Sequence, residues 1–451
     1  MAESNSPLSI KTQAPNVKPL VIHIIGLGVT QRAELDSPAR DALNCASWVI
    51  GSERQLEVID HLLDSHVNKK SLPPLRELSS WLNDKSKSAD ADKQIVVLAS
   101  GDPLFYGIGR WFSKQFSAQD LHFYPAVSSI QAACHVLGLA LQDTDVLSLH
   151  GRPLAQIRKT LKPFQTLIVL SDKLSRPQAL AQECIQAGFL DATITVCETL
   201  GYAEQRITNF KVTDLSESDQ HFDPLHLSVI KTENVSNIKK GSNTKALILP
   251  SFPGIPDEAF MTNAEPGKGM LTKREVRLAI LSLMQTNNAD VIWDIGAGCG
   301  SVAIELAYWN KLVQVHAIEH HADRVACLEQ NRARFGVVSQ LNIVNGSAPE
   351  CLSDLPSPSK IFIGGSDGRL TELLQMAWEA LPVDGLLVAS AVTENSKQHL
   401  MNFMQSRENA KDSELETLQI AVSKGSQLAG QLVYRPSLAV SLFKFTKRRV
   451  L

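Results

Sequence analysis

The chain has 451 residues, of which 44% are hydrophobic and 20% are charged, and its formal net charge is −3. This is the composition of an ordinary globular protein, long enough for about three domains of ~150 residues. So small a charge provides no basic field that would attract nucleic acid or a membrane surface. We therefore expect no nucleic-acid partner and no membrane partner.

The cysteines and the N-terminal residues indicate which kind of protein and which cell compartment to expect. The seven cysteines are scattered and contain no C-x-x-C pair, which argues against a disulfide framework or a zinc site. We accordingly expect no bound metal. Residues 1–17 are predicted to be a polar, disordered tail rather than a signal peptide. No apolar run reaches the roughly 18 residues of a membrane span, so a cytoplasmic protein is the simplest interpretation.

Short aliphatic runs, each followed by a turn, predict the strands of the first half of the chain. Between these runs lie segments with the periodicity and capping residues of helices. Alternating strands and helices predict an α/β fold. The predicted strands are 20–25, 48–50, 95–99, 146–149, 166–170, 193–197 and 225–230, and the predicted helices are 37–46, 129–137 and 177–187.

Two of these strands run into turns that suit a ligand. The first ends in Gly26-Leu-Gly28, for which a tight turn that binds nothing is an equally good interpretation. The strand 95–99 ends in Ser100-Gly-Asp-Pro103. In that loop we favour Asp102 as the cap of the following helix over Asp102 as a ligand for an amine.

Two later turns offer a hydroxyl and a cation. Ser128 or Ser129 is a natural N-cap for the helix that follows, and the same hydroxyls suit a carboxylate or a ribose. His150-Gly-Arg152 follows the next strand. Arg152 either clamps an acidic substrate or is a surface arginine after a turn, and the sequence favours neither.

Taken in order and spacing, four segments resemble the tetrapyrrole (corrin/porphyrin) methylase family. They are Gly26-Leu-Gly28, Ser100-Gly-Asp-Pro103, Pro125-Ala-Val-Ser-Ser129 and His150-Gly-Arg152. In that family a methyl donor binds in a cleft between two α/β lobes, and the resemblance covers about residues 18–230. It implies a donor site formed by Gly26, Gly28, Ser100, Gly101, Asp102, Pro103, Ser128 and Ser129. Ala126 stands where the family would have glycine, which should only tighten that turn.

Residues 231–253 differ in character from what precedes them. The stretch is polar and without periodicity, and Pro250, Pro253 and Pro256 punctuate its end. Such composition is typical of an interdomain linker. We therefore expect a second domain at 254–451.

A glycine turn is the clearest chemical feature of this second half. The apolar run Val291–Trp293 leads into Asp294, glycines follow at 296, 298 and 300, and a helix pattern begins near Ser301. Glycines let a ligand lie against the backbone, and a helix start directs unsatisfied N–H groups at it. The order strand, turn, helix predicts a nucleotide-type binding site.

The spacing indicates which nucleotide. The pattern is G-x-G-x-G, whereas the dinucleotide fingerprint is G-x-G-x-x-G. Glu319 ends the next apolar run, 23 residues after Gly296, near the offset at which an acid accepts hydrogen bonds from ribose. The combination resembles the S-adenosylmethionine site of Rossmann-like methyltransferases. A dinucleotide site and a turn that binds nothing are the less favoured alternatives.

A helix start precedes the glycine turn. Thr272-Lys-Arg-Glu275 has the pattern of a capping box, with Thr272 as the cap. Lys273, Arg274 and Arg277 crowd the first turns of this helix. We favour ordinary surface charge as their explanation, with a site for carboxylates as the alternative.

Four segments of this half resemble the decarboxylating precorrin methyltransferases: Gly254–Phe260, Thr272–Arg277, Asp294–Ser301 and Ile361–Gly365. The resemblance covers about residues 254–445, with further strands predicted at 341–344, 361–363, 386–391 and 438–445. Ser347 replaces a usual acid, and Cys299 a usual threonine or serine. The implied donor-binding residues are Thr272, Gly296, Ala297, Gly298, Cys299, Gly300, Glu319, Ser347 and Ala348.

Together the halves resemble fused methyltransferases of cobalamin synthesis. The resemblance implies two S-adenosylmethionine sites, one per domain, and a precorrin or cobalt-precorrin substrate. It implies methylation at macrocycle carbons 5 and 15 with decarboxylation of the ring-C acetate, in a homo-oligomer. Arg152, Lys273 and Arg274 are the candidates for binding substrate carboxylates. We name no catalytic base, and His150, His320 and His321 stay unassigned.

Three other functions compete with this one. Relatives of the N-terminal fold methylate RNA, but the chain lacks a basic, aromatic-interleaved tract. A dinucleotide-dependent oxidoreductase would need a third glycine at a different offset. A non-enzymatic scaffold would not need two intact glycine turns and Glu319. The segment Glu265–Gly269 has no role that the sequence suggests.

Overall fold

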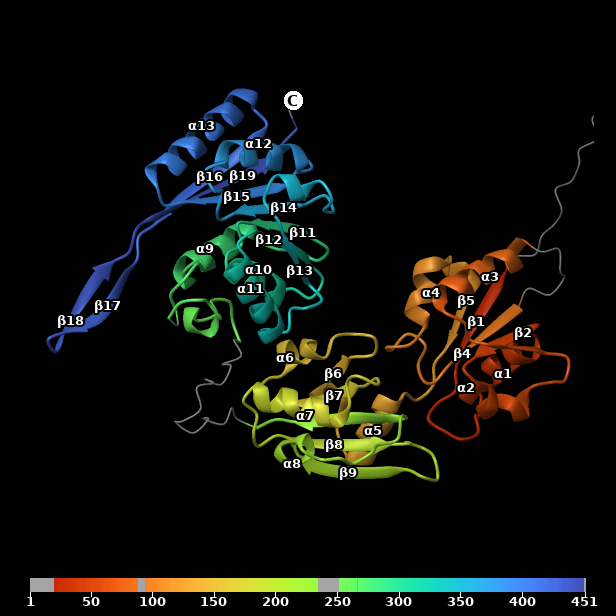
Figure 1. Cartoon of the computed structure of the whole chain (residues 1–451). Helices are drawn as coiled ribbons and strands as arrows, with labels where there is room; N and C mark the ends of the chain where they lie inside the picture. Colours follow the sequence, from red (N-terminus) through yellow and green to blue (C-terminus); the bar gives the residue numbers. More distant parts are fainter. Residues whose placement is uncertain (1–19, 88–93, 234–250, 266, 450–451) are drawn as a thin grey trace, which may run out of the picture.

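The computed structural model describes residues 20–87, 94–233, 251–265 and 267–449. Most of the predicted tail and linker, namely residues 1–17 and 234–250, lies outside the described residues. The described strands form three large sheets and one two-stranded sheet, with helices packed on them (Figure 1). None of the described helices is long and apolar enough to cross a membrane.

The first sheet is parallel, in the order β3-β2-β4-β1-β5. Its central strands β1 and β4 are buried because helices cover both faces, which is why their sequences are apolar apart from His23 and Gln94. Helix α1 begins where Asp36 accepts a hydrogen bond from Ala39 N–H, with Pro38 in its first turn. The elements are β1 (Val21–Gly26), α1 (Ser37–Asn44), β2 (Trp48–Gly51), α2 (Glu53–Ile59), β3 (Asn68–Ser71), α3 (Leu75–Lys87), β4 (Gln94–Ala99), α4 (Gly109–Gln115) and β5 (Leu121–Tyr124).

The second sheet is mixed, in the order β6-β7-β10-β8-β9. Only the pair β6 and β7 is parallel, and the other neighbours are antiparallel. Helix α5 packs on this sheet through Ile130, Ala133 and Cys134. The elements are α5 (Ser129–Leu137), β6 (Asp145–Ser148), α6 (Ile157–Thr160), β7 (Thr166–Leu170), α7 (Pro177–Gln186), β8 (Thr193–Glu198), β9 (Arg206–Lys211), α8 (Val212–Ser216) and β10 (His226–Lys231).

The third sheet has seven strands, in the order β13-β12-β11-β14-β15-β19-β16. The first five are parallel, and β19 and β16 are antiparallel additions at one edge. Its elements are α9 (Arg274–Met284), β11 (Val291–Ile295), α10 (Ser301–Trp309), β12 (Gln314–Glu319), α11 (Ala322–Arg334), β13 (Leu341–Asn345), β14 (Lys360–Ile363), α12 (Leu370–Ala380), β15 (Leu386–Ala391), α13 (Glu394–Ala410), β16 (Ser413–Ile420) and β19 (Val440–Lys447).

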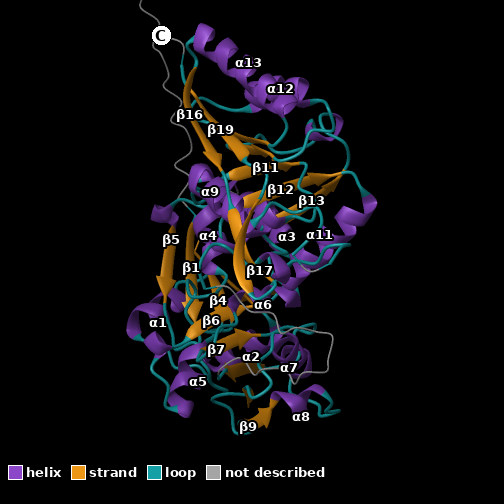
Figure 2. Ribbon diagram, turned by 90° about the vertical axis from the view of Figure 1, so that its left-hand side faces the viewer, coloured by secondary structure: helices purple, strands orange, loops and turns teal. Residues whose placement is uncertain are grey.

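Helices cover both faces of this third sheet. One apolar core lies under α9, α10 and α11, and a second lies under α12 and α13. Figure 2 shows the two helical layers on opposite sides of the strands. The remaining strands, β17 (Ser423–Leu428) and β18 (Gln431–Pro436), pair only with each other among the described strands. They form a hairpin that projects from the sheet, seen at the lower left of the blue region in Figure 1.

The predicted start of the helix after Thr272 is wrong. Helix α9 begins at Arg274, and the flanking Lys273 makes no side-chain capping bond. Thr272 instead donates its backbone N–H to Ser301 Oγ over 3.1 Å. The backbone of Thr272 is thus held against the start of α10, and no side-chain bond from it to the first turn of α9 is present among the described residues.

Arg277 is not a surface charge. Its side chain is 0% exposed, and its Nε donates to Glu305 Oε1 over 2.6 Å, where Glu305 is also 0% exposed. Its Nη1 donates to Asp257 Oδ1 over 3.1 Å, and its Nη2 donates to the Ile255 carbonyl. The guanidinium therefore ties the start of the C-terminal half to α9 and α10.

The second sheet and the third sheet are connected through α6. Lys159 Nζ donates to the Ala307 carbonyl of α10 over 2.7 Å, and Arg158 Nη1 donates to the Ala333 carbonyl of α11 over 3.3 Å. Burial, and to a lesser degree Lys311, lowers the pKa of Lys159 to about 8. Both cations thus lie at the C-terminal ends of helices, where the helix dipole favours positive charge.

The buried network gives a prediction for stability. Arg277→Met should lower the free energy of unfolding by about 3–5 kcal/mol, because Glu305 and Asp257 would remain buried without a counter-charge. Urea denaturation of the whole chain, followed by tryptophan fluorescence, measures it, since Trp309 Nε1 donates to Glu305. Arg274→Met, on the exposed side of the same helix, is the control and should change the value by less than about 0.5 kcal/mol. Equal, small losses in both variants would contradict the role given to Arg277.

Candidate methyl-donor sites

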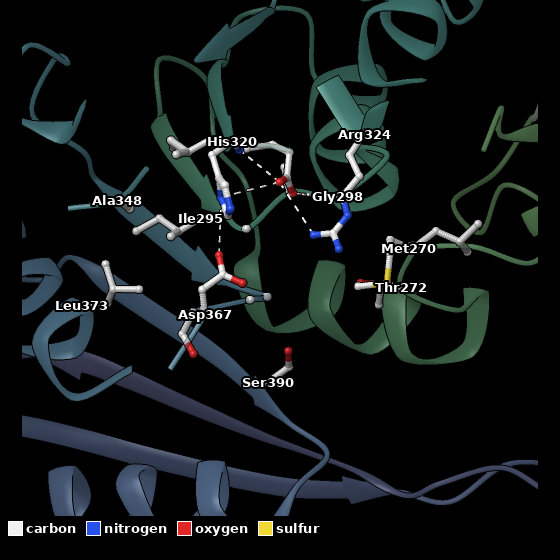
Figure 3. A pocket seen from close by; sticks show the side chains of 18 of the residues that line it. Met270, Thr272, Ile295, Gly298, His320, Arg324, Ala348, Asp367, Leu373 and Ser390 are labelled. Carbon is white, nitrogen blue, oxygen red and sulfur yellow. Dashed lines mark hydrogen bonds and ion pairs between the residues drawn. The ribbon is translucent and has the colours of Figure 1, made fainter. Parts of the chain in front are cut away.

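A cavity of about 440 Å³ opens at the carboxyl ends of β11 to β15. The register pairs Ile295 with Ile318 on one side and with Ile363 on the other, so the loops that follow these strands meet. A crevice at this edge, where strand order reverses, is where open α/β sheets bind ligands. Figure 3 shows the side chains around it. From the strand-end loops it is lined by 296–298, 319–320, 346–348 and 364–367.

The three glycines of the turn have different roles. Gly296, Ala297 and Gly298 line the cavity, as predicted for donor-binding residues. Gly300 lies outside the lining, and a Cβ there would stand 2.0 Å from Leu328 Cδ1, so this glycine allows α10 to pack against α11. Cys299 is also outside the lining and is fully buried.

Glu319 is held at the base of the cavity by backbone N–H groups. Its Oε2 accepts from Gly298 N over 2.9 Å, and its Oε1 accepts from His320 N over 3.0 Å and His321 N over 2.9 Å. Arg324 lies 3.7 Å from Oε1. A carboxylate has about four acceptor positions, so this one is positioned and still has room to accept a hydroxyl.

The opposite wall of the cavity is the segment that precedes α9. It is fastened to the glycine turn, because Cys299 N–H donates to the Met270 carbonyl over 2.9 Å. Thr272, a predicted donor-binding residue, and Lys273, a candidate for substrate carboxylates, line the cavity. Gly269, the last residue of the segment whose role the sequence left open, lines it as well. Arg274 is not in the lining; its guanidinium lies 3.7 Å from Glu275. Ser347 and Ala348 line the cavity from the loop after β13.

His320 and Asp367 approach each other from two loops of the cavity. His320 Nδ1 lies 3.4 Å from Asp367 Oδ2, a contact drawn as a dashed line in Figure 3. Glu319, His320 and His321 also have potential metal-ligand atoms within 4.8 Å of one another. We assign no metal to this cluster.

Asp294 is a buried acid directly behind the glycine turn. It is 1% exposed, and neither carboxylate oxygen has a hydrogen-bond donor at full bonding geometry. Burial raises the pKa of Asp294 to about 7; the Ala303 backbone N–H lowers it, and the nearby Glu319 raises it further. The fold therefore favours the neutral form of this carboxyl group.

A second cavity, also of about 440 Å³, is lined by residues of the first and second sheets and the loops that follow their strands. The parallel register of β1 and β4 pairs Gly26 with Ala99, which brings the loops after them together. Gly26 must be glycine here, because a Cβ would stand 2.2 Å from the Gly101 carbonyl oxygen. Most of the predicted donor-binding residues of this half line the cavity: Gly28, Ser100, Gly101, Asp102, Ser128 and Ser129. Gly26 and Pro103 lie outside the lining.

Two of these predictions concerned helix caps. Ser128 does cap α5, since its Oγ accepts from Gln131 N over 3.2 Å and Gln131 bonds back. The prediction that Asp102 caps a helix is wrong. Asp102 Oδ1 accepts from Leu104 N over 2.8 Å and closes a local turn, whereas α4 begins only at Gly109.

The structure places a different arginine in this cavity from the predicted one. Arg152 Nη1 donates to the Ser148 carbonyl over 3.1 Å, and Arg152 is not part of the lining. Arg54, which sequence reasoning missed, does line the cavity, together with His150. Its position in the sequence could have indicated it. Arg54 follows the end of β2 by three residues, and ligands bind at the carboxyl ends of parallel strands.

Two family models divide the chain. The model of tetrapyrrole (corrin/porphyrin) methylases matches residues 21–216, and the model of the precorrin methyltransferase domain matches residues 264–447. The fold and the two cavities thus define a tandem methyltransferase. The predicted α/β class is confirmed, with a two-sheet tetrapyrrole methylase fold followed by a Rossmann-like methyltransferase sheet.

Relatives that match nearly the whole chain identify the particular family. The chain is 32% identical to the precorrin-6Y C(5,15)-methyltransferase (decarboxylating) of Sinorhizobium sp, over 94% of this chain and 96% of the relative. It is 30% identical to the protein of that name from Mycobacterium tuberculosis, over 95% of this chain and 100% of the relative. A probable cobalt-precorrin-6B C(15)-methyltransferase (decarboxylating) from Pyrobaculum aerophilum is 32% identical over 41% of this chain and 91% of its own length. The chain belongs to the precorrin-6Y C(5,15)-methyltransferase (decarboxylating) family.

The raised pKa of Asp294 gives a prediction for pH dependence. Its folded value of about 7 exceeds the unfolded value of about 3.9, so the folded state binds more protons between these two values. The free energy of unfolding should therefore fall as pH rises from about 4 to 7, by at most about 4 kcal/mol from this group. Asp294→Asn removes that loss. Urea unfolding at several pH values measures this. The free energy of unfolding of the variant should rise relative to that of the natural protein as pH rises.

The exposed Asp323→Asn on α11 is the matched control, and its curve should run parallel to that of the natural protein. If the Asp294→Asn curve is parallel as well, the carboxyl group titrates at an ordinary pKa.

Proposed function

We propose that this chain performs two S-adenosylmethionine-dependent methylations of a precorrin. One adds a methyl group at macrocycle carbon 5, and the other adds one at carbon 15 with decarboxylation of the ring-C acetate, in cobalamin synthesis. The names and full-length coverage of the relatives support this assignment. The observation that carries it is the presence of two separate cavities, one in each family-matched half, each at the carboxyl ends of parallel strands.

The C-terminal cavity suits S-adenosylmethionine. Its volume of about 440 Å³ lies within the usual range for small-molecule sites, roughly 300–1,000 Å³. We propose that Glu319 accepts hydrogen bonds from the ribose hydroxyls, because its carboxylate is already positioned against Gly298. Ser347 and Ala348 would flank the adenine. Gly296 to Gly298 would form the floor, and Thr272 part of the opposite wall.

The N-terminal cavity would hold the second donor. We propose that the Ser100–Asp102 loop and Gly28 contact it through the backbone, since Asp102 uses its carboxylate to shape the loop. Ser128 uses its hydroxyl as a helix cap, which leaves the hydroxyl of Ser129 free for a polar group of the ligand. We place the domain boundaries at 18–230 and 254–451, joined by 231–253.

Catalysis would consist mainly of positioning. The donor supplies a methyl group on a sulfonium, which is already a good leaving group. The chain has to align donor and macrocycle and exclude water, which contributes about 7–11 kcal/mol in favourable cases. Lys273 is the cation best placed to bind a substrate carboxylate in the C-terminal cavity. Among the described residues its Nζ donates only to the Gly267 carbonyl, whereas Arg324 and Arg369 face acids.

Removing one donor site should separate the two reactions. With precorrin-6Y and S-adenosylmethionine, the natural chain should add two methyl groups and release carbon dioxide, as read by mass spectrometry. Glu319→Ala should add one methyl group without losing carbon dioxide. Calorimetry with S-adenosylhomocysteine should show two sites for the natural chain and one for this variant.

The exposed Glu329→Ala on α11 is the control and should retain both methylations. Loss of both methylations in folded Glu319→Ala would contradict the assignment of one donor site to each half.

We further propose that the chain forms a homo-oligomer through the β17–β18 hairpin. Leu428, Leu432 and Tyr434 on it are 55%, 60% and 68% exposed. The outer edge of each strand lacks a partner among the described strands, which makes the hairpin a template for strand pairing. A second copy fits because its hairpin offers the same free edges and the same apolar side chains.

Replacing Leu428, Leu432 and Tyr434 together by serine should convert the assembly to monomers, as measured by light scattering after size-exclusion chromatography. Met401→Ser, an exposed position on α13, should leave the mass unchanged. An unchanged mass in the triple variant would place any self-contact elsewhere.

A further inference from the structure

The N-terminal cavity contains an arginine without a counter-charge. Among the described residues that line it, Arg54 is the one lysine or arginine, and Asp102 is the one acid. Asp102 Oδ1 is occupied by the backbone N–H groups of Leu104 and Phe105. No carboxylate in the described part of the chain lies within ion-pair distance of Arg54. A cation that faces a cavity and has no described carboxylate within ion-pair distance is suited to an anionic ligand.

Two neutral hydroxyls hold the guanidinium. Arg54 Nη1 donates to Tyr202 Oη over 2.9 Å, and Nη2 donates to Ser100 Oγ over 3.0 Å. Ser100 Oγ also accepts from Gln55 Nε2 over 3.1 Å. A guanidinium has five N–H groups, and these contacts use two of them. The remaining three have no acceptor among the described residues and are available to a ligand, and the hydroxyls fix the plane in which they lie.

Arg54 is also fixed between the two lobes. It comes from α2 beside the first sheet, whereas Tyr202 comes from the loop that follows β8 of the second sheet. That loop contacts the first lobe again nearby, where Gln31 Nε2 donates to Glu204 Oε2 over 3.1 Å. The arginine is thus positioned by both lobes that enclose the ligand, as a preorganised anion site requires.

We propose that Arg54 is the carboxylate-binding residue of the N-terminal cavity, with Tyr202 as its positioning residue. The carboxylate belongs either to an acetate or propionate side chain of the macrocycle or to the methionine part of the methyl donor. This inference rests on the proposed function and deepens it. It replaces Arg152, whose guanidinium bonds the Ser148 carbonyl outside the cavity lining.

The test uses the full-length chain and follows the carbon-5 methylation by mass spectrometry. Arg54→Gln should raise the KM for the macrocycle, or the Kd for S-adenosylhomocysteine in the N-terminal site, by about 10- to 150-fold. That factor corresponds to a charged hydrogen bond of about 1.5–3 kcal/mol. A rise in KM assigns the carboxylate to the macrocycle, and a rise in Kd assigns it to the donor. Arg54→Lys should recover part of the loss.

Two further variants separate binding from a purely structural role. Tyr202→Phe removes the hydrogen bond from Arg54 Nη1 and keeps the guanidinium in the cavity. It should therefore change KM and Kd by less than about 5-fold, because the charged hydrogen bond to the carboxylate is retained. Arg40→Gln, an exposed position on α1, should change neither. In Arg54→Gln the carbon-15 methylation should persist, which shows that the chain is folded.

Unchanged KM and Kd in Arg54→Gln would overturn the proposal, and so would equal effects of Arg54→Gln and Tyr202→Phe together with equal losses of thermal stability. Failure of the natural chain to methylate precorrin-6Y at all would instead contradict the proposed function, and the calorimetric comparison would still report on Arg54.

Discussion

The buried ion pair between Arg277 and Glu305 holds the C-terminal half together where that half begins. Two charges without water cost several kcal/mol each, and such a pair is tolerated only where its other hydrogen-bonding positions are satisfied. Here they are, since Glu305 also accepts from the backbone N–H groups of Gly254 and Ile255. The pair therefore fastens the entering segment, α9 and α10 at one point. The wall 269–273 lies between that segment and α9, so its place beside the glycine turn depends on this network.

Both cavities obey one rule of topology but use different chemistry. Parallel strands end at the same edge of a sheet, so their loops converge whatever residues they carry. In the C-terminal half the end of β12 supplies an acid, Glu319, held by backbone donors. In the N-terminal half the one acid in the described lining, Asp102, accepts hydrogen bonds from its own loop. The groups left to bind a ligand there are serine hydroxyls and backbone groups. The same ligand would therefore be bound by a carboxylate in one half and by hydroxyl and amide groups in the other.

Burial decided which strands could be predicted from the sequence. Strand β15 was predicted at 386–391, its observed bounds, because strands covered on both faces are mostly apolar, and in β15 only Ser390 is polar. Strands β9 and β16 were missed because they are largely exposed and have no apolar run. The glycine turn and Glu319 were found because their chemistry depends on local order. These signals lie within one strand and the loop that follows it.

Burial of a charge, in contrast, depends on partners far along the chain. Arg277 meets Asp257 and Glu305 from 20 and 28 residues away, and nothing local distinguishes it from the exposed Arg274 on the same helix. For Arg54 the position after β2 was a local signal, but its partner Tyr202 lies 148 residues away in the other lobe, so the sequence does not show how its guanidinium is held. A single sequence reveals which residues bear charge, but folding decides which charges face a cavity.

The contact between the two halves acts on the helices that border the C-terminal cavity. Helix α10 begins at the glycine turn, and at about 1.5 Å per residue its nine residues span about 13 Å. At its far end the Ala307 carbonyl accepts from Lys159, and Arg158 holds the end of α11 in the same way. Two domains joined by a linker alone would leave their cavities free to turn independently. These helix-end bonds give the C-terminal cavity a second support, and that support comes from the half that carries the other cavity.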